Sequence, residues 1–218
     1  TRFPQFNLAG NEEGYYEPTA GYLRPENCIF AQMKIAQKNG ARMMANTKVS
    51  LVAPLDKNKV LVQTSLGPFT AGKVVVSAGA WVKKLLGNKF DSIFEIHRQV
   101  LYWFSIKDNY NKFVPDRFPV FIWNGPDNFI YGFQAINGPE GGLKVASENT
   151  DVADPDRINR DVSPEEIAEM RMKVSMLLPG IGSKCVKAGV CMSTETPDKG
   201  FVIDYHPECE NIIIASPC

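Results

Sequence analysis

The chain has 218 residues, with 24 basic and 24 acidic side chains and a formal net charge of zero. Apolar types make up 44% of the residues and charged types 22%, which excludes the disordered, collagen-like and coiled-coil classes. The neutral balance also argues against nucleic-acid binding, because such binding depends on a basic face that neutralises phosphates.

We predict no membrane span, because no apolar run approaches the roughly 20 residues that a spanning helix needs. We also predict no signal peptide, because no basic segment followed by an apolar stretch occurs in residues 1–20. The cysteines are odd in number and irregularly spaced, and two histidines give little basis for zinc, so we expect a cytoplasmic protein without disulfides or a metal site. The chain stops directly after the apolar run 212–215, so we interpret it as a fragment. The cysteines are Cys28, Cys185, Cys191, Cys209 and Cys218.

In the first part of the chain, residues 1–20 have the composition of a loop. Pro25 begins a predicted helix in which apolar residues recur every three or four positions, and Gly40 ends it. Alternating apolar residues and a turn at 56–58 then predict a hairpin, followed by a fully apolar strand. The strands predicted in this part are residues 41–45, 48–54, 59–65 and 73–76.

From Phe94 onward, aromatic-rich strands separated by turns such as 124–127 predict an antiparallel sheet. Ser163, Pro164 and Glu166 form an N-terminal capping pattern that predicts one long helix, which ends at 179–180. The strands predicted in this part are residues 99–106, 120–123, 129–133, 143–147, 185–192, 200–204 and 211–215.

These elements predict an α+β fold in two parts. Residues 1–90 with 195–218 have the texture of a truncated layered domain, and residues 91–194 that of an antiparallel-sheet domain covered by a helix.

Motif searches by themselves point to no chemistry. The glycine-rich stretches 138–142 and 180–182 do not join a strand to a helix, so they indicate turns rather than phosphate loops. No G-x-S-x-G surrounds a serine, and His97 and His206 lie in unlike contexts. From composition alone, Cys191 would be a buried small apolar residue and Lys144 a side chain facing water.

Several segments, in order over nearly the whole chain, carry a resemblance to a known family. The chain resembles the monomeric sarcosine oxidase and N-methyltryptophan oxidase group of the D-amino-acid oxidase-like flavoproteins. The matching segments are residues 14–28, 76–81 with 85–86, 98–100, 131–133, 142–144, 188–198 and 201–204.

The resemblance implies an FAD-dependent oxidoreductase that oxidises secondary amines, such as sarcosine or N-methyltryptophan, to imines while O₂ becomes H₂O₂. It makes residues 1–90 with 195–218 the middle of an FAD/NAD(P)-binding domain and residues 91–194 the substrate domain. The family's glycine fingerprint for FAD and its C-terminal end lie outside this chain. The fragment is therefore expected to lack FAD and to be inactive. The whole protein is expected to be a monomer whose only partners are its amine substrate and O₂.

The resemblance also implies residue roles. Cys191 would carry FAD through a thioether, Lys144 would assist O₂ reduction, and Tyr131 would lie at the substrate. Further cofactor contacts would come from Met192, Val49, Ser77, Ala78, Gly79 and Trp81.

One position departs from the family pattern. Glu148 stands where the sarcosine oxidases have a substrate-site histidine, and an anion there favours a cationic or bulkier amine. Two alternatives therefore stay open: another amine or amino-acid oxidase or dehydrogenase of the same family, and a ligand-binding relative without catalysis.

Overall fold

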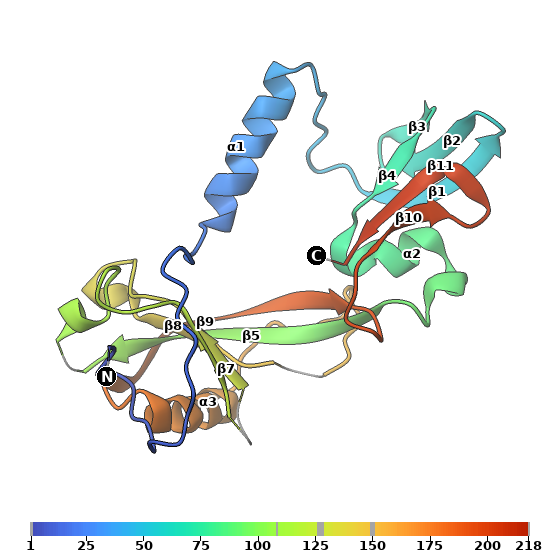
Figure 1. Cartoon of the computed structure of the whole chain (residues 1–218). Helices are drawn as coiled ribbons and strands as arrows, with labels where there is room; N and C mark the ends of the chain where they lie inside the picture. Colours follow the sequence, from blue (N-terminus) through green and yellow to red (C-terminus); the bar gives the residue numbers. More distant parts are fainter. Residues whose placement is uncertain (1, 108, 126–128, 149–150, 218) are drawn as a thin grey trace. The chain divides into compact units, whose positions relative to one another are not determined.

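The computed structural model describes residues 2–107, 109–125, 129–148 and 151–217. Its contacts divide the chain into two compact units, and Figure 1 labels most of their helices and strands. Unit 1 comprises Thr1–Pro25, Gln99–Thr150 and Asn159–Cys191, and unit 2 comprises Glu26–Arg98, Asp151–Ile158 and Met192–Cys218.

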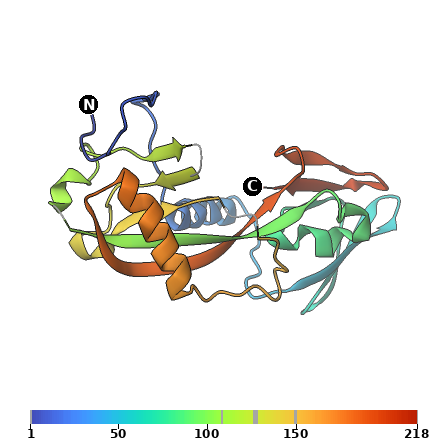
Figure 2. The ribbon, with the colours of Figure 1, turned by 90° about the horizontal axis from the view of Figure 1, so that it is seen from below.

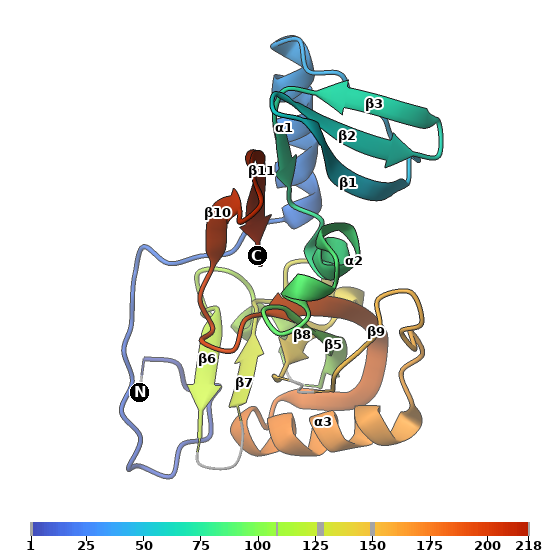
Figure 3. The ribbon, with the colours of Figure 1, turned by 90° about the vertical axis from the view of Figure 1, so that its right-hand side faces the viewer.

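Unit 1 is built on a five-stranded sheet in the order β6-β7-β8-β5-β9, whose strands lie side by side in Figure 3. The pairs β6–β7, β7–β8 and β5–β8 are antiparallel, which confirms the predicted antiparallel sheet. The strands are β5 (Glu95–Ile106), β6 (Phe121–Asn124), β7 (Phe129–Gly132), β8 (Leu143–Ala146) and β9 (Ile181–Glu195), and two short 3₁₀ helices are η3 (Tyr110–Lys112) and η4 (Pro139–Gly141).

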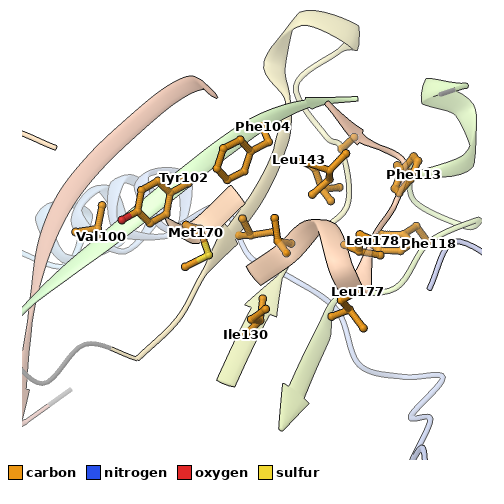
Figure 4. Packing of buried hydrophobic residues seen from close by; sticks show 14 residues of the cluster. Val100, Tyr102, Phe104, Phe113, Phe118, Ile130, Leu143, Met170, Leu177 and Leu178 are labelled. Carbon is orange, nitrogen blue, oxygen red and sulfur yellow. The ribbon is translucent and has the colours of Figure 1, made fainter. Parts of the chain in front are cut away.

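The helix α3 (Pro164–Leu177) covers one face of this sheet, as Figure 2 shows in orange. It begins where predicted, because Ser163 and Glu166 exchange the two hydrogen bonds of a capping box. Met170 and Val174 of its apolar side pack against sheet residues in the cluster drawn in Figure 4. The buried members of this core are Val100, Tyr102, Phe104, Phe113, Phe118, Ile130, Ala135, Leu143, Val145, Met170, Val174, Leu177, Leu178 and Ile181.

Unit 2 holds two three-stranded sheets. One is an antiparallel meander in the order β1-β2-β3, and the other has the order β10-β11-β4, with β4 parallel to β11. Its strands are β1 (Val49–Asp56), β2 (Lys59–Thr64), β3 (Gly67–Ala71), β4 (Val74–Val76), β10 (Val202–His206) and β11 (Cys209–Ser216). Its helical elements are α1 (Pro25–Lys38), η1 (Gly79–Trp81), α2 (Val82–Leu86) and η2 (Asn88–Phe90).

The core of unit 2 is smaller and joins α2 to both sheets. Val82 of α2 packs with Val60 of β2 and with Ile212 and Ile214 of β11. By contrast, no residue of α1 is buried, and Ile29, Phe30 and Ile35 are more than half exposed. None of the helices in the described residues is long and apolar enough to span a membrane.

Two features differ from the sequence-based expectations. Residues 41–45 form no strand, so that prediction is wrong. The N-terminal residues belong to unit 1 by contact, because the Asn7 backbone N–H donates to Leu177 O at 2.8 Å. Parts of two other expectations, Pro126 and Asp127 of the turn at 124–127 and the thiol of Cys218, lie outside the described residues.

Candidate functional site

The sheet of unit 1 presents a second face, opposite the one that packs on α3. Trp103 of β5 pairs directly with Lys144 of β8. Tyr131 of β7 pairs with Ala146, which lies two residues after Lys144 on β8. Paired residues share a face and side chains alternate along a strand, so Tyr131, Lys144 and Trp103 point to the same side. Their neighbours Leu143 and Val145 point into the core. We call the surface that carries Tyr131, Lys144 and Trp103 the open sheet face.

Lys144 is half-buried between aromatic rings on the open sheet face. Its Nζ lies 4.7 Å from the ring centre of Phe133 and 5.5 Å from that of Trp103. The Nζ of Lys187 lies 4.7 Å from the same Trp103 ring. Alternation alone correctly gives the face of Lys144, but Trp103 of β5 and Phe133, which directly follows β7, keep its side chain from being fully in water.

Cys191 is exposed. The interpretation from composition alone, that it is a buried apolar residue, is therefore wrong. Partial removal from water raises the pKa of its thiol, while the positive charges of Lys144 and Arg160 act in the opposite direction. Burial also raises the pKa of the Tyr131 hydroxyl, and the negative charges of Cys191 and Glu148 add to the effect. These couplings bring together four predicted site residues: Tyr131, Lys144, Glu148 and Cys191.

The surface beside Cys191 on β9 is open. Gly189 stands two residues before Cys191 and therefore on the same face, and a Cβ added there would meet no atom within 4 Å. A glycine inside a strand often marks a place where a ligand approaches the backbone. The exposed sulfur, the open space over Gly189 and the nearby aromatic rings fit a planar group such as the isoalloxazine of FAD.

The other predicted cofactor residues lie in unit 2. Ser77, Ala78 and Gly79 follow β4 directly, at the carboxyl end of a strand that runs parallel to β11. Ligands of open α/β sheets bind beyond such strand ends. Gly79 has a φ of 54°, and a Cβ there would also meet nothing within 4 Å, so the turn can accept a close ligand.

Three further predicted residues complete the set in unit 2. Val49 begins β1, and Met192 lies in β9; both are half-buried. Trp81 ends η1 with an exposed indole, whose Nε1 donates to Asp156 Oδ1 at 2.7 Å. The structure thus assigns Val49, Ser77, Ala78, Gly79, Trp81 and Met192 to unit 2, whereas Tyr131, Lys144, Glu148 and Cys191 belong to unit 1.

Sequence reasoning missed one concave feature of unit 2. A hollow of about 210 Å³ is lined by Thr194, Glu195, Thr196, Lys199, Gly200, Phe201 and Pro217. Thr196 shapes its loop, because its hydroxyl lies 2.8 Å from Asp198 Oδ1 and 2.9 Å from Gly200 O. The Thr-x-Asp-x-Gly spacing was the only sequence signal for it, and that spacing indicates a turn rather than a ligand.

The whole chain, residues 1–218, matches a family model described as FAD dependent oxidoreductase. The monomeric sarcosine oxidase of Streptomyces avermitilis is 36% identical over 208 residues, which are 94% of this chain and 54% of that protein. The N-methyl-L-tryptophan oxidase of Salmonella dublin is 31% identical over 218 residues, which are 98% of this chain and 56% of that protein.

Solved structures show the same fold at lower identity. NikD, described as an unusual amino acid oxidase essential for nikkomycin biosynthesis, superposes with a TM-score of 0.68 at 18% identity, covering 88% of this chain and 51% of that chain. Amadoriase I of Aspergillus fumigatus, a fructosyl amine:oxygen oxidoreductase, gives 0.67 at 20% identity, covering 89% and 47%. These similarities confirm the predicted α+β fold.

The chain spans about half the length of the curated relatives it matches. The family match nevertheless covers every residue of the chain, and the sarcosine oxidase relative aligns over 94% of it. The chain therefore belongs to the FAD dependent oxidoreductase family.

Proposed function

We propose that the full-length protein is an oxidase of secondary amines, with N-methyl amino acids as the substrate class. Unit 2 would bind FAD together with chain outside these 218 residues, and unit 1 would bind the amine. The protein would act as a cytoplasmic monomer, and the 218 residues alone would be inactive. The observation that carries the proposal is that Tyr131 and Lys144 share the open sheet face. Lys187, whose Nζ lies over the Trp103 ring of this face, stands four residues before Cys191 on β9, so alternation puts Cys191 on the same side.

When bound, FAD would supply the redox chemistry, namely the two-electron oxidation of the amine to an imine and the two-electron reduction of O₂ to H₂O₂. Cys191 would hold the cofactor through a thioether. Support comes from its exposed sulfur and from the open space over Gly189 beside it. A thiolate is the reactive form; partial removal from water raises the pKa of the Cys191 thiol, and the charges of Lys144 and Arg160 oppose that rise.

Lys144 would stabilise the negative charge that develops on O₂ as it is reduced. Among the described residues, its ammonium group has no carboxylate within ion-pair distance, and its neighbours are the rings of Phe133 and Trp103. A fixed positive charge in a poorly hydrated place acts on a transition state without the cost of reorienting water.

Tyr131 and Glu148 would define the substrate side of the site. The Glu148 carboxylate is close enough to Tyr131 to raise the pKa of its hydroxyl. A negative charge beside the phenol would attract an amine in its cationic form and would repel a carboxylate brought close to it. We therefore expect the preferred substrate to keep its own carboxylate away from Glu148.

The test is an amine screen of the full-length protein for peroxide release, run with Lys144→Met and Lys187→Met. Lys187→Met also removes an ammonium group at Trp103, so it controls for the loss of charge. We expect Lys144→Met to slow flavin reoxidation by O₂ by at least about 100-fold while reduction by the amine continues, and Lys187→Met to stay close to the parent. A parent protein that releases no peroxide with any amine yet is reduced by one would indicate a dehydrogenase.

A further inference from the structure

A short acidic turn, residues 154–157, contacts Trp81 and Lys84, which closely follow the turn that we assign to the cofactor in unit 2. Asp154 Oδ1 accepts a hydrogen bond from Lys84 Nζ at 2.8 Å, and Asp156 accepts a second one from the same Nζ. Asp156 also accepts the Trp81 indole N–H at 2.7 Å. One carboxylate thus contacts both α2 and the last residue of η1.

The backbone of unit 2 holds this acidic turn in place. The Ala153 N–H donates to Ile96 O at 2.8 Å, and the Arg98 N–H donates to Asp151 O at 2.9 Å. Within the turn, the Asp156 N–H donates to Asp154 Oδ1 at 3.0 Å. The two carboxylates are therefore presented to α2 and Trp81 from a segment fixed on β5.

Trp81 needs such a partner to have a defined orientation. It is 40% exposed and stands two residues after Gly79, whose φ of 54° belongs to a region that few residues adopt. A charge-assisted hydrogen bond to the indole restricts both the ring and the short helix that carries it. The positive charge of Lys48, which directly precedes Val49, also acts on Asp156.

We propose that Asp156 is a positioning residue for cofactor binding: it holds the Trp81 indole and so fixes the turn Ser77–Gly79 in the geometry that receives FAD. The role rests on the proposed function, because the cofactor contact of that turn is part of it. Asp154 supports the acidic turn and Lys84 but does not contact Trp81.

The chain offers variants that separate the hydrogen bond from the charge. Asp156→Asn keeps an oxygen that can accept the indole N–H and loses the charge, whereas Asp156→Ala loses both. Trp81→Phe keeps a ring and loses the donor. Asp154→Asn loses the charge that faces Lys84 and keeps an oxygen that can accept the Asp156 backbone N–H, so it is the matched control.

FAD affinity would be measured on full-length protein carrying Cys191→Ser, so that binding is reversible. We expect Asp156→Ala and Trp81→Phe each to weaken binding roughly fivefold, with no further loss when combined, and Asp156→Asn and Asp154→Asn to stay within about twofold. In the 218-residue chain, the Trp81 indole N–H should exchange with solvent faster in Asp156→Ala, with Trp103 and Trp123 as internal references.

Two results would overturn the proposal: FAD binding by Asp156→Ala equal to that of the parent, or an indole exchange rate that this substitution leaves unchanged. Thermal unfolding of each variant shows whether it is folded; if Asp156→Ala is not, Asp156→Leu, which is similar in size and cannot accept the indole N–H, decides in its place. A parent that binds no FAD would contradict the proposed function and this role with it. Loss of affinity in Asp156→Asn equal to that in Asp156→Ala would show that charge, and not the indole hydrogen bond, is what matters.

Discussion

At the scale of single residues, the thiol of Cys191 is the most informative group. Desolvation raises its pKa and the Lys144 ammonium opposes that rise. Removing the ammonium in Lys144→Met should therefore raise the pKa further and leave less thiolate at pH 8. We expect iodoacetamide to alkylate Cys191 about two- to fivefold more slowly, measured in the 218-residue chain by mass spectrometry of the Cys191 peptide.

The control for this measurement is Lys187→Met. It removes a positive charge from the same face, but Lys187 is not among the groups whose charge acts on Cys191. Its alkylation rate should match the parent. Equal rates in the parent and in Lys144→Met would show that the ammonium does not influence the sulfur.

For two glycines of unit 1, substitution by alanine is expected to affect the unfolding free energy very differently. Gly142 has a φ of 71°, and an added Cβ would lie 2.8 Å from Phe104 O, so Gly142→Ala should cost about 2 kcal/mol of unfolding free energy or more. Gly189 faces open space, so Gly189→Ala should change the unfolding free energy by less than about 0.5 kcal/mol. Denaturant unfolding of the two variants checks both values.

Gly189→Val extends the same argument to the cofactor. A β-branched residue suits a strand, so the 218-residue chain should unfold at a similar denaturant concentration. In full-length protein the extra methyl groups would fill the space beside Cys191, and FAD incorporation should fall sharply. Normal incorporation would mean that the cofactor does not lie over Gly189.

At the scale of elements, the sequence predicts best what local chemistry determines. The start of α3 follows from Ser163, Pro164 and Glu166, whose capping interactions are within one turn of helix. The strand predicted at 41–45 is wrong, since a strand also needs a neighbour to pair with, and no pattern in the local sequence shows one. β3 was missed because it contains Pro68, which an edge strand tolerates.

The same limit applies to the candidate site. Alternation correctly gives the face of Lys144, but the ring partners Trp103 and Phe133 come from other segments of the sheet. The start of β9 at Ile181 was hidden by Gly182, which the sequence presents as part of a turn. A Cβ there would lie 2.2 Å from Ser105 Oγ, so the glycine instead permits close approach of β5.

The capping box gives an element-scale prediction. The Glu166 N–H donates to Ser163 Oγ at 3.2 Å, and the Ser163 N–H donates to Glu166 Oε2 at 2.8 Å. Ser163→Ala removes the first bond and should lower the unfolding free energy by about 1 kcal/mol, measured by denaturant unfolding. Ser163→Asp keeps an acceptor and should restore most of it; equal losses in both variants would contradict a capping role.

The acidic turn predicts a pH dependence. Hydrogen bonds from Lys84 lower the pKa values of Asp154 and Asp156 below the ordinary aspartate value of about 3.9. A lowered folded-state pKa means that the stabilisation is present above the unfolded value and is lost as the pH falls through the folded one. Protection of the Trp81 indole N–H should therefore stay constant from about pH 7 to 5 and fall only below about pH 4.

In Asp156→Asn the loss of indole N–H protection below about pH 4 should be smaller, because the carboxylate that accepts the indole N–H and titrates in this range is gone. An indole whose protection already falls near pH 6 would point to a group other than these carboxylates. Lys84, whose pKa the same bonds raise, stays charged throughout this range.

At the scale of the whole molecule, the 218 residues leave apolar surfaces uncovered. α1 buries none of its residues, and Val75 of β4 and Ile203 of β10 are 60% and 77% exposed. Parallel strand pairs such as β4–β11 are usually covered on both faces. In the proposed full-length protein, about twice as long as this chain, we expect additional structure over these surfaces and over the cofactor.

The most direct test of the account is whether the full-length protein carries FAD on Cys191. After acid precipitation, the parent protein should give a yellow pellet, and its Cys191 peptide should carry the mass of the flavin. Cys191→Ser should release the colour into the supernatant while the fold is retained. A colourless pellet from the parent, with all of its flavin free in solution, would contradict the thioether and the place assigned to the cofactor on the open sheet face.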